Sequence, residues 1–169
     1  MELIFPTIEW KQAALEFRQE HFDIGETVIH GDGGLDDAET YESWLERIQA
    51  DLTRNDGTFV PSTQFFAVVE GKIVGMIQIR HVLNNFLLNY GGHIGYGIRP
   101  TQRRKGHATK MLALVLEKCR EMGIEKALLT CDKGNTGSAK TITNNGGVFE
   151  NEVTQDNGNI TQRYWIAIK

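Results

Sequence analysis

The feature that most constrains this fold is a short basic turn that joins an apolar strand pattern to an amphipathic helix pattern. Ile94–Ile98 has the composition of a strand, and the apolar positions of 108–122 recur at spacings of four and three, which predicts a helix with one buried face. Gly123 marks the end of this helix. A strand followed by a turn and a helix is typical of an α/β protein, in which the helix packs on the sheet.

The turn itself, residues 103–109, has the properties of an anion-binding site. The first amides of a helix have no intrahelical acceptor, and the helix dipole places partial positive charge beside them. Gly106 lacks a Cβ and allows the backbone to approach a ligand closely. Five of the chain's 18 Lys and Arg residues fall within this region: Arg99, Arg103, Arg104, Lys105 and Lys110. Because the whole chain carries a net charge of −4, this local basicity predicts a site for a diphosphate.

Composition limits the classes of protein to which this chain can belong. The 169 residues are 40% hydrophobic and 24% charged, which predicts one globular domain across 1–169. No stretch approaches the ~18 apolar residues of a membrane span, and the first residues lack a signal-peptide pattern. We therefore expect a cytoplasmic protein with no membrane partner. The net charge of −4 also argues against nucleic acid as a partner.

The two cysteines are also consistent with a cytoplasmic protein. Cys119 falls on the apolar stripe of the helix over 108–122, and Cys131 lies at the end of a strand pattern. We expect both to be reduced packing residues and not a disulfide.

The remaining elements follow from periodicity and from turn residues. Residues 23–37 contain four glycines and predict a mobile loop without regular structure. The tight Glu70-Gly71 corner predicts an antiparallel hairpin. The expected strands are 3–5, 65–69, 72–79, 94–98, 127–131, 148–153 and 163–168, the expected helices are 8–21, 38–52, 108–122 and 136–144, and 84–90 is expected to be a loop.

Two well-known phosphate-binding motifs do not fit the spacing of the basic turn. A P-loop ends in Gly-Lys-Ser/Thr, whereas His107 follows Gly106 here. A dinucleotide fingerprint that starts at Gly95-x-Gly97 would need its third glycine where Pro100 stands. Both nucleotide-binding folds are therefore excluded.

What remains, Arg103-x-x-Gly106-x-Ala108, resembles the acyl-CoA-binding signature Gln/Arg-x-x-Gly-x-Gly/Ala of the GNAT superfamily of N-acetyltransferases. Asn135-x-x-Ser138, followed by residues 146–149, Gly-Gly-Val-Phe, resembles the family's Asn-x-x-Ala/Ser…Gly-Phe segment. The order of predicted elements is also the GNAT order along essentially the whole chain.

The resemblance implies both a fold and an activity. The fold is α/β (α+β), with a mixed, mostly antiparallel central sheet of about seven strands flanked by about four helices. The activity is that of an acyltransferase that uses acetyl-CoA as cosubstrate and needs no metal.

The resemblance also implies roles within the turn. The backbone amides of 105–109 would hold the diphosphate of acetyl-CoA, while the side chains of Arg103, Arg104 and Lys105 would add positive charge and reach toward the ribose phosphate. The expected coenzyme-binding residues are Tyr96, Ile98, Arg103, Arg104, Lys105, Gly106, His107, Ala108, Thr109, Asn135 and Ser138. For Asn135 and Ser138 a purely structural interpretation stays open, because Asn and Ser are common in turns and helix caps.

The reaction implied is direct attack by an amine on the thioester, which requires a base, an oxyanion donor and a proton source for the departing thiolate. We expect backbone amides near 96–98 to bind the oxyanion. His93, at the start of the central strand, is the leading candidate for the catalytic base, because an imidazole titrates near neutral pH. Three alternatives stay open: a strand histidine bonded to a neighbouring carbonyl, a water relay, or another base among His21, Glu20, Asp32 and His81.

Ile142 departs from the family pattern. Many GNAT enzymes carry a tyrosine in the helix after the Asn motif that protonates the departing sulfur, and counting from Asn135 that position falls on Ile142. Isoleucine cannot donate a proton, so water, another side chain or the substrate's ammonium must do so. The departure supports a second hypothesis, a non-catalytic acyl-CoA-binding or sensing module.

The acceptor is expected to be a primary amine of a small molecule, because the long N-terminal half can cover the slot. The glycines of 31–34 would permit a loop to close, or would be disordered. Acidic residues nearby suit a cationic amine, although such residues are usually solvated surface: Glu20, Asp23, Asp32, Asp36 and Asp37. The resemblance also makes a homodimer the expected assembly.

Overall fold

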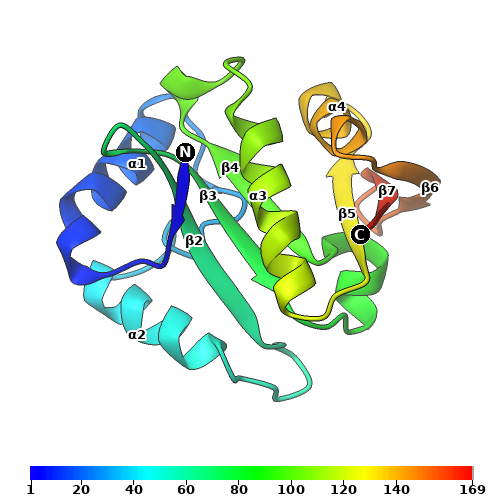
Figure 1. Cartoon of the computed structure of the whole chain (residues 1–169), viewed down its shortest axis with the longest axis horizontal. Coiled ribbons are helices and arrows are strands. Elements are labelled where there is room, and N and C mark those ends of the chain that lie inside the picture. The colour runs from blue at the N-terminus through cyan, green and yellow to red at the C-terminus, as the bar shows by residue number, and fades with distance from the viewer. Residues whose placement is uncertain (169) are drawn as a thin grey trace.

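The computed structural model describes residues 1–168 (Figure 1). The strands are β1 (Glu2–Ile4), β2 (Ser62–Val69), β3 (Lys72–Arg80), β4 (Ile94–Ile98), β5 (Lys126–Asp132), β6 (Val148–Thr154) and β7 (Ile160–Ala167). The helices are α1 (Lys11–Asp23), α2 (Tyr41–Asp51), α3 (His107–Glu121) and α4 (Thr136–Asn144). Within this described part, the strands and α-helices confirm the predicted order of elements.

The strands form two sheets, whereas the sequence predicted one. The first sheet has the order β1-β2-β3-β4 and the second has the order β5-β7-β6. All pairings within the described residues are antiparallel. A backbone bond of 2.7 Å from the His93 amide to the Leu128 carbonyl joins the start of β4 to β5. The division between the sheets therefore runs along the strand that leads into the predicted binding turn.

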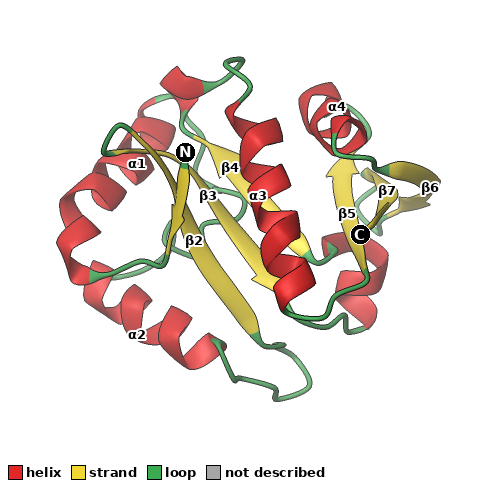
Figure 2. Ribbon diagram, viewed as in Figure 1, coloured by secondary structure: helices red, strands yellow, loops and turns green. Residues whose placement is uncertain are grey.

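Helices cover both faces of the first sheet (Figures 1 and 2). On one face, Phe17 of α1 and Trp44 of α2 pack in a cluster with Phe66 of β2. On the other face lies α3. The predicted positions Leu112, Val115 and Cys119 are buried, and Met111 is buried as well. Ala108 is half-buried, and Met122 is exposed just after the helix ends.

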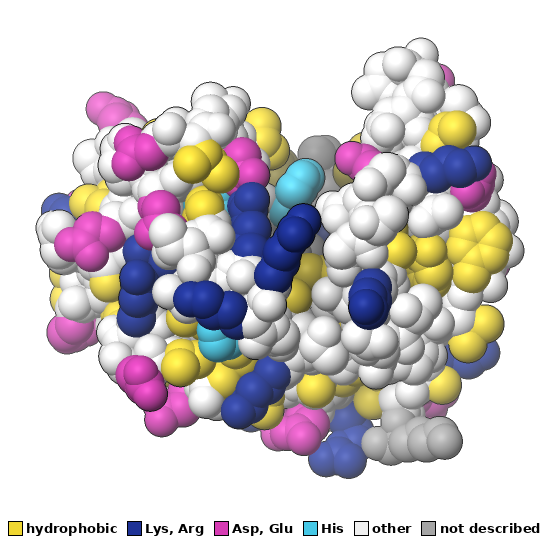
Figure 3. All heavy atoms as spheres, turned by 90° about the horizontal axis from the view of Figure 1, so that it is seen from above, with side chains coloured by type: hydrophobic (Ala, Val, Ile, Leu, Met, Phe, Trp, Pro, Cys, Tyr) yellow, Lys and Arg dark blue, Asp and Glu magenta, His cyan; other side chains and the backbone are white. Residues whose placement is uncertain are grey.

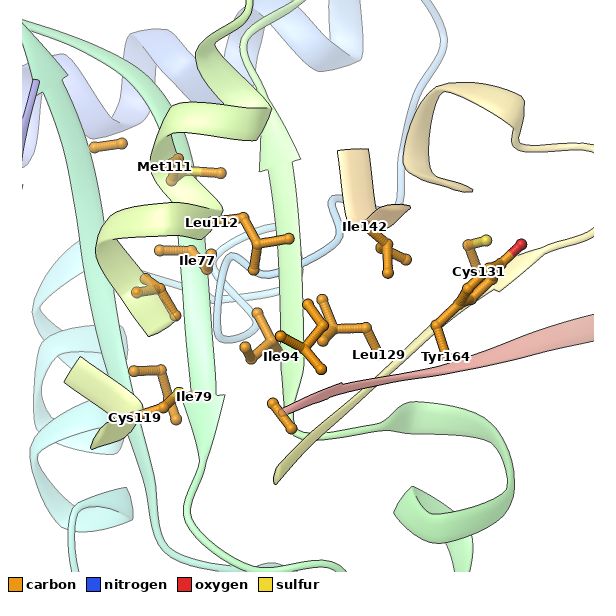
Figure 4. Packing of buried hydrophobic residues seen from close by; sticks show 14 of the residues in the cluster. Ile77, Ile79, Ile94, Met111, Leu112, Cys119, Leu129, Cys131, Ile142 and Tyr164 are labelled. Carbon is orange, nitrogen blue, oxygen red and sulfur yellow. The ribbon is translucent and has the colours of Figure 1, made fainter. Parts of the chain in front are cut away.

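The cluster beneath α3 also holds the two sheets together. Figure 4 shows Ile77 and Ile94 of the first sheet in the same group as Leu129 of β5 and Ile142 of α4. The cysteines Cys119 and Cys131 are buried and free, which confirms their assignment as reduced packing residues.

The structure corrects three local predictions. The first helix begins with a 3-10 turn, Ile8–Trp10, before α1 starts at Lys11. The segment 84–90, expected to be a loop, contains a turn of π-helix at Leu87–Gly91. Helix α2 begins later than predicted, after Thr40, whose side chain accepts a bond from the Ser43 amide at 3.0 Å.

The loop between α1 and α2 has no regular element, as its glycines predict, but it is packed and not the mobile segment that we expected. Ile29 and Leu35 are buried in the core cluster of α1 and α2. The Trp44 indole donates to the Asp32 carbonyl at 3.0 Å. The Asp32 carboxylate accepts bonds from the amides of Gly34 and Asp36, at 2.8 and 2.6 Å. The number of glycines in a segment indicates how freely its backbone can bend. It does not indicate whether the segment forms hydrogen bonds with the rest of the protein, as this loop does.

Two further results concern residues 1–168. No helix in this range is long and apolar enough to cross a membrane. No group of three or more His, Cys, Asp or Glu side chains in this range is placed to hold a metal ion.

Candidate active site

A cavity of about 1020 Å³ opens where the end of β4 meets the starts of α3 and α4. Seen from above, the molecule is hollowed between two lobes, and Lys, Arg and His side chains lie along the hollow (Figure 3). Ten of the predicted coenzyme-binding residues line this cavity: Tyr96, Ile98, Arg103, Arg104, Gly106, His107, Ala108, Thr109, Asn135 and Ser138. Lys105 is not part of the lining, and its Nζ donates to Gln102 Oε1 at 3.2 Å.

The start of α3 presents free amides to this cavity. Gly106 has φ +80°, a left-handed conformation that favours glycine, and a Cβ at this position would meet no heavy atom within 4 Å. Within residues 1–168, no side chain caps α3, and the amides of His107, Ala108 and Thr109 find no acceptor. These donors, together with the helix dipole, form a suitable site for a diphosphate.

The middle of β4 supplies a second set of free amides. In an antiparallel pair, hydrogen-bonded residue pairs alternate with non-bonded ones. The 2.9 Å bond from the Arg99 amide to Val74 and the register of β3 with β4 make Gly97 and Gly95 the bonded residues of β4. The amides of Tyr96 and Ile98 therefore face away from β3, toward the division between the sheets.

Arg103 is engaged by a carboxylate, which changes its predicted role. Its Nη1 and Nη2 donate to the two oxygens of Glu26 at 2.7 and 2.5 Å, and its Nε donates to the Ile98 carbonyl at 3.2 Å. The bond from Arg103 lowers the pKa of Glu26 to about 2. Arg103 thus connects the loop after α1 to the end of β4, and Glu26 compensates its charge.

Two other lining cations, Arg104 and Lys140, have no carboxylate within 4 Å among residues 1–168.

Two hydroxyl groups lie close together in this first cavity. The Tyr96 and Ser138 hydroxyls lie 2.8 Å apart. Burial raises the pKa of Tyr96, so its hydroxyl keeps its proton at neutral pH. Asn135 caps α4 by accepting a bond from the Ser138 amide at 3.0 Å. Ile142, at the position of the family's tyrosine, is fully buried in the core.

His93 has the environment of a structural histidine. Its Nδ1 accepts a bond from the Leu128 amide at 2.9 Å, and its ring packs edge-on against Trp165. Burial, together with the nearby charge of Arg80, lowers the pKa of His93 to about 4. His93 lines neither of the two cavities. This position does not support the predicted role as the base. The alternative of a structural histidine fits better, although the partner of the ring is the Leu128 amide and not a carbonyl.

The other predicted bases are also engaged. Glu20 pairs with Arg99 at 2.9 Å, and His81 bonds to Thr63 at 2.8 Å and lines neither cavity. His21 lines the first cavity, but its Nδ1 bonds to Glu26 at 2.8 Å, and its buried Nε2 has no partner within residues 1–168. Burial raises the pKa of Asp32 to about 7, although amides occupy both of its oxygens.

A second cavity, of about 820 Å³, adjoins the first. It is lined by the loop between α1 and α2, by α2, by the residues that precede β2 and by the end of β3. The two cavities share Ile29 and His30. His30 is exposed, and it is the one histidine within residues 1–168 that lines both cavities.

Close backbone contacts fix His30 against β4. A Cβ on Gly31 would overlap the backbone of Gly95 and Tyr96, and a Cβ on Gly97 would lie 2.6 Å from the His30 carbonyl oxygen. The Gln64 amide group donates to the Gly31 carbonyl at 2.7 Å. The segment carrying His30 therefore lies directly on the middle of β4, beside the free amides.

Sequence reasoning missed His30, Lys140 and most of the lining of the second cavity, although it placed the loop over 31–34 and Asp37 near the acceptor. His30 lies in a glycine-rich loop in which no helical or strand period indicates its direction. The signal that could have found it is the pair of glycines at 95 and 97, because glycine inside a strand often marks the close approach of another backbone.

The sequence of residues 27–146 matches the family model described as the acetyltransferase (GNAT) family. The chain therefore belongs to the GNAT family. It is an N-acetyltransferase, and acetyl-CoA is its cosubstrate.

Solved structures agree on the fold. The microcin C7 self-immunity acetyltransferase MccE, in complex with acetyl-CoA and AMP, is 16% identical with a TM-score of 0.73 over 98% of this chain and 91% of that chain. RimL, a ribosomal L7/L12 α-N-protein acetyltransferase in complex with coenzyme A, is 14% identical with a TM-score of 0.71 over 98% and 93%. The putative acetyltransferase yncA of Salmonella typhimurium, with acetyl-CoA, is 12% identical with a TM-score of 0.66 over 99% and 94%. A comparison with curated proteins found no match.

Proposed function

We propose that the protein transfers the acetyl group of acetyl-CoA to a primary amine of a small molecule that binds in the second cavity. The observation that carries this proposal is the contact between the two cavities at Ile29 and His30. A donor in the first cavity and an acceptor in the second meet there, beside the middle of β4. The amine then attacks the thioester directly.

The coenzyme half of the site fits its substrate. The free amides of His107 to Thr109 and the cations Arg104 and Lys140 face the first cavity and suit a diphosphate and a ribose phosphate. The amides of Tyr96 and Ile98 are directed away from β3 and can donate to the pantetheine arm and to the oxyanion that forms during attack.

The acceptor must lose a proton, because an ammonium has no lone pair for the attack. His30 replaces His93 as the proposed base, since it is exposed, lines both cavities and lies over Gly97. An imidazole accepts and releases a proton near neutral pH. His93, by contrast, would have to give up its bond to Leu128.

The departing thiolate must gain a proton. Tyr96 is the proposed donor, with Ser138 bonded to it at 2.8 Å, because its hydroxyl is protonated and lines the coenzyme cavity. A tyrosine on β4 would thus replace the family's tyrosine, whose position in α4 is taken by the buried Ile142.

The size of the second cavity supports a small acceptor and not a protein terminus, since about 820 Å³ is within the usual range for small-molecule sites. The buried free cysteines are consistent with a reducing compartment and support a cytoplasmic location. A homodimer stays a prediction, which sedimentation analysis of the purified chain would test.

The test is release of the CoA thiol when the purified protein is mixed with acetyl-CoA and a panel of amines, with mass spectrometry of the products. We expect turnover that requires both substrates. Acetyl-CoA binding without thiol release for any amine would instead support the sensing module.

Tyr96→Phe should lower kcat by roughly 100-fold with little change in acetyl-CoA affinity. Tyr164→Phe is the matched control, because the Tyr164 hydroxyl bonds to Gln162 outside both cavities.

A further inference from the structure

The second cavity contains an arginine whose charge is not compensated. Arg47 pairs with Asp37 at 3.3 Å, and Arg54 pairs with Asp56 at 2.7 Å and with Asp51 at 3.8 Å. Arg80 is the remaining arginine of the lining, and no carboxylate lies within 4 Å of it among residues 1–168.

Arg80 is held in place by neutral groups alone. Its Nη1 donates to the carbonyls of Gly91 and Gly92 at 3.0 and 3.3 Å. These bonds fix the plane of the guanidinium and leave its other nitrogens without a hydrogen-bond partner among residues 1–168. Burial lowers the pKa of Arg80, which means that removal from water disfavours its charge. A partly buried cation of this kind is stabilised when an anion binds beside it.

Arg80 and His30 lie over neighbouring parts of the same strand. A Cβ on Gly95 would lie 3.3 Å from Arg80 Nη2, and a Cβ on Gly97 would lie 2.6 Å from the His30 carbonyl. Gly95 and Gly97 are roughly 7 Å apart on β4. Arg80 and His30 both line the second cavity, so one small acceptor bound there can contact both residues.

We propose that the acceptor is an amino-acid-like molecule, whose carboxylate or phosphonate binds Arg80 while its amine reaches His30. The inference rests on the proposed function and specifies its substrate class. Planar guanidinium groups bind carboxylate and phosphate oxygens with two parallel bonds, which gives both affinity and orientation. Gln78 and Ser62 lie in the same lining and supply neutral donors beside Arg80.

The test compares kcat/KM for L-α-amino acids with kcat/KM for the matching carboxamides, using the full-length protein and acetyl-CoA. An aminoalkylphosphonate series separates phosphonate from carboxylate recognition. In the wild-type protein we expect acids to be preferred once the different basicities of the amines are normalised. Arg80→Gln should reduce the ratio of acid to carboxamide roughly 10- to 100-fold, the range for loss of a charged hydrogen bond. Arg80→Lys should retain part of the preference.

Arg54→Gln is the matched control, because it removes a paired arginine from the same cavity. It should change the ratio less than about threefold. Calorimetric titration with acetyl-CoA shows that each variant is folded. An equal ratio in wild type and Arg80→Gln overturns the inference and leaves the proposed function standing. A wild-type protein that acetylates no amine overturns both.

Discussion

The two cavities differ in the parts of the chain that line them. The first has main-chain amides from two short contiguous segments, β4 and the start of α3, with side chains from α4 beside them. The second is lined by segments that are far apart in sequence, including the loop between α1 and α2, α2 itself and the end of β3. A surface made of backbone leaves a local pattern of glycines and turns, whereas dispersed side chains leave a much weaker one. The sequence therefore predicted most of the lining that the first cavity shows, but for the second only the loop over 31–34 and nearby acidic residues.

The largest effect should come from blocking the first cavity, where free main-chain amides are the proposed donors to acetyl-CoA. Gly106→Trp places a large side chain in the coenzyme cavity, beside the free amides of α3, so we expect acetyl-CoA affinity to fall at least about 100-fold in calorimetric titration. Gly158→Trp is the control, because Gly158 has a similar φ of +84° and equally open surroundings outside both cavities. Unchanged affinity in Gly106→Trp would remove the start of α3 from the site.

Removing the proposed base, His30, should have the next largest effect, which we expect on kcat. His30→Ala should lower kcat by roughly 100-fold, the usual contribution of a general base, while acetyl-CoA affinity changes little. Added imidazole should restore part of the rate, because His30 is exposed in the cavity. His81→Gln is the control, since His81 lines neither cavity. A His30→Ala protein with the wild-type rate would show that the amine is deprotonated elsewhere.

His93→Asn distinguishes the two histidine assignments. Asparagine can accept the Leu128 amide bond in place of Nδ1, so we expect turnover within about threefold of wild type and a loss of roughly 1–2 kcal/mol of stability from the missing ring. A 100-fold fall in kcat in a folded variant would restore His93 as the base.

His93 should also make stability depend on pH. The unfolded chain binds a proton at this histidine below about pH 6.5, whereas the folded chain does so only below about 4. The wild-type free energy of unfolding should therefore fall as pH decreases from about 6.5 to 4. Denaturant titrations across this window should show a shallower decline for His93→Asn.

The smallest effect concerns the pair that holds Arg103. Glu26→Gln removes a negative charge from the coenzyme cavity and releases the guanidinium, so acetyl-CoA should bind about two- to fivefold more tightly at low salt. The gain should vanish near 1 M salt, where charges are screened. Glu152→Gln, which removes an exposed pair with Lys133, is the control. Weaker binding would mean that the pair positions the site and does not restrain Arg103.

The predictions from sequence succeeded where chemistry is local. The spacing of α3 identified most of its buried face, and the predicted coenzyme-binding residues of the Gly106 turn, apart from Lys105, lie together in the first cavity. The separation of β4 from β5 could not be predicted, because strand patterns do not report which edges pair. The choice of a base is difficult for a similar reason. His93 directly precedes a strand that the pattern reveals, whereas the proposed base His30 is held by close contacts of Gly31 and Gly97 across about 65 residues of chain.

The unpaired side of β4 has one further consequence. An exposed strand edge usually invites the strand of another molecule and leads to aggregation. Here residues from the starts of α3 and α4 line the cavity beside this edge. A second polypeptide would therefore have to enter the cavity before it could pair with β4.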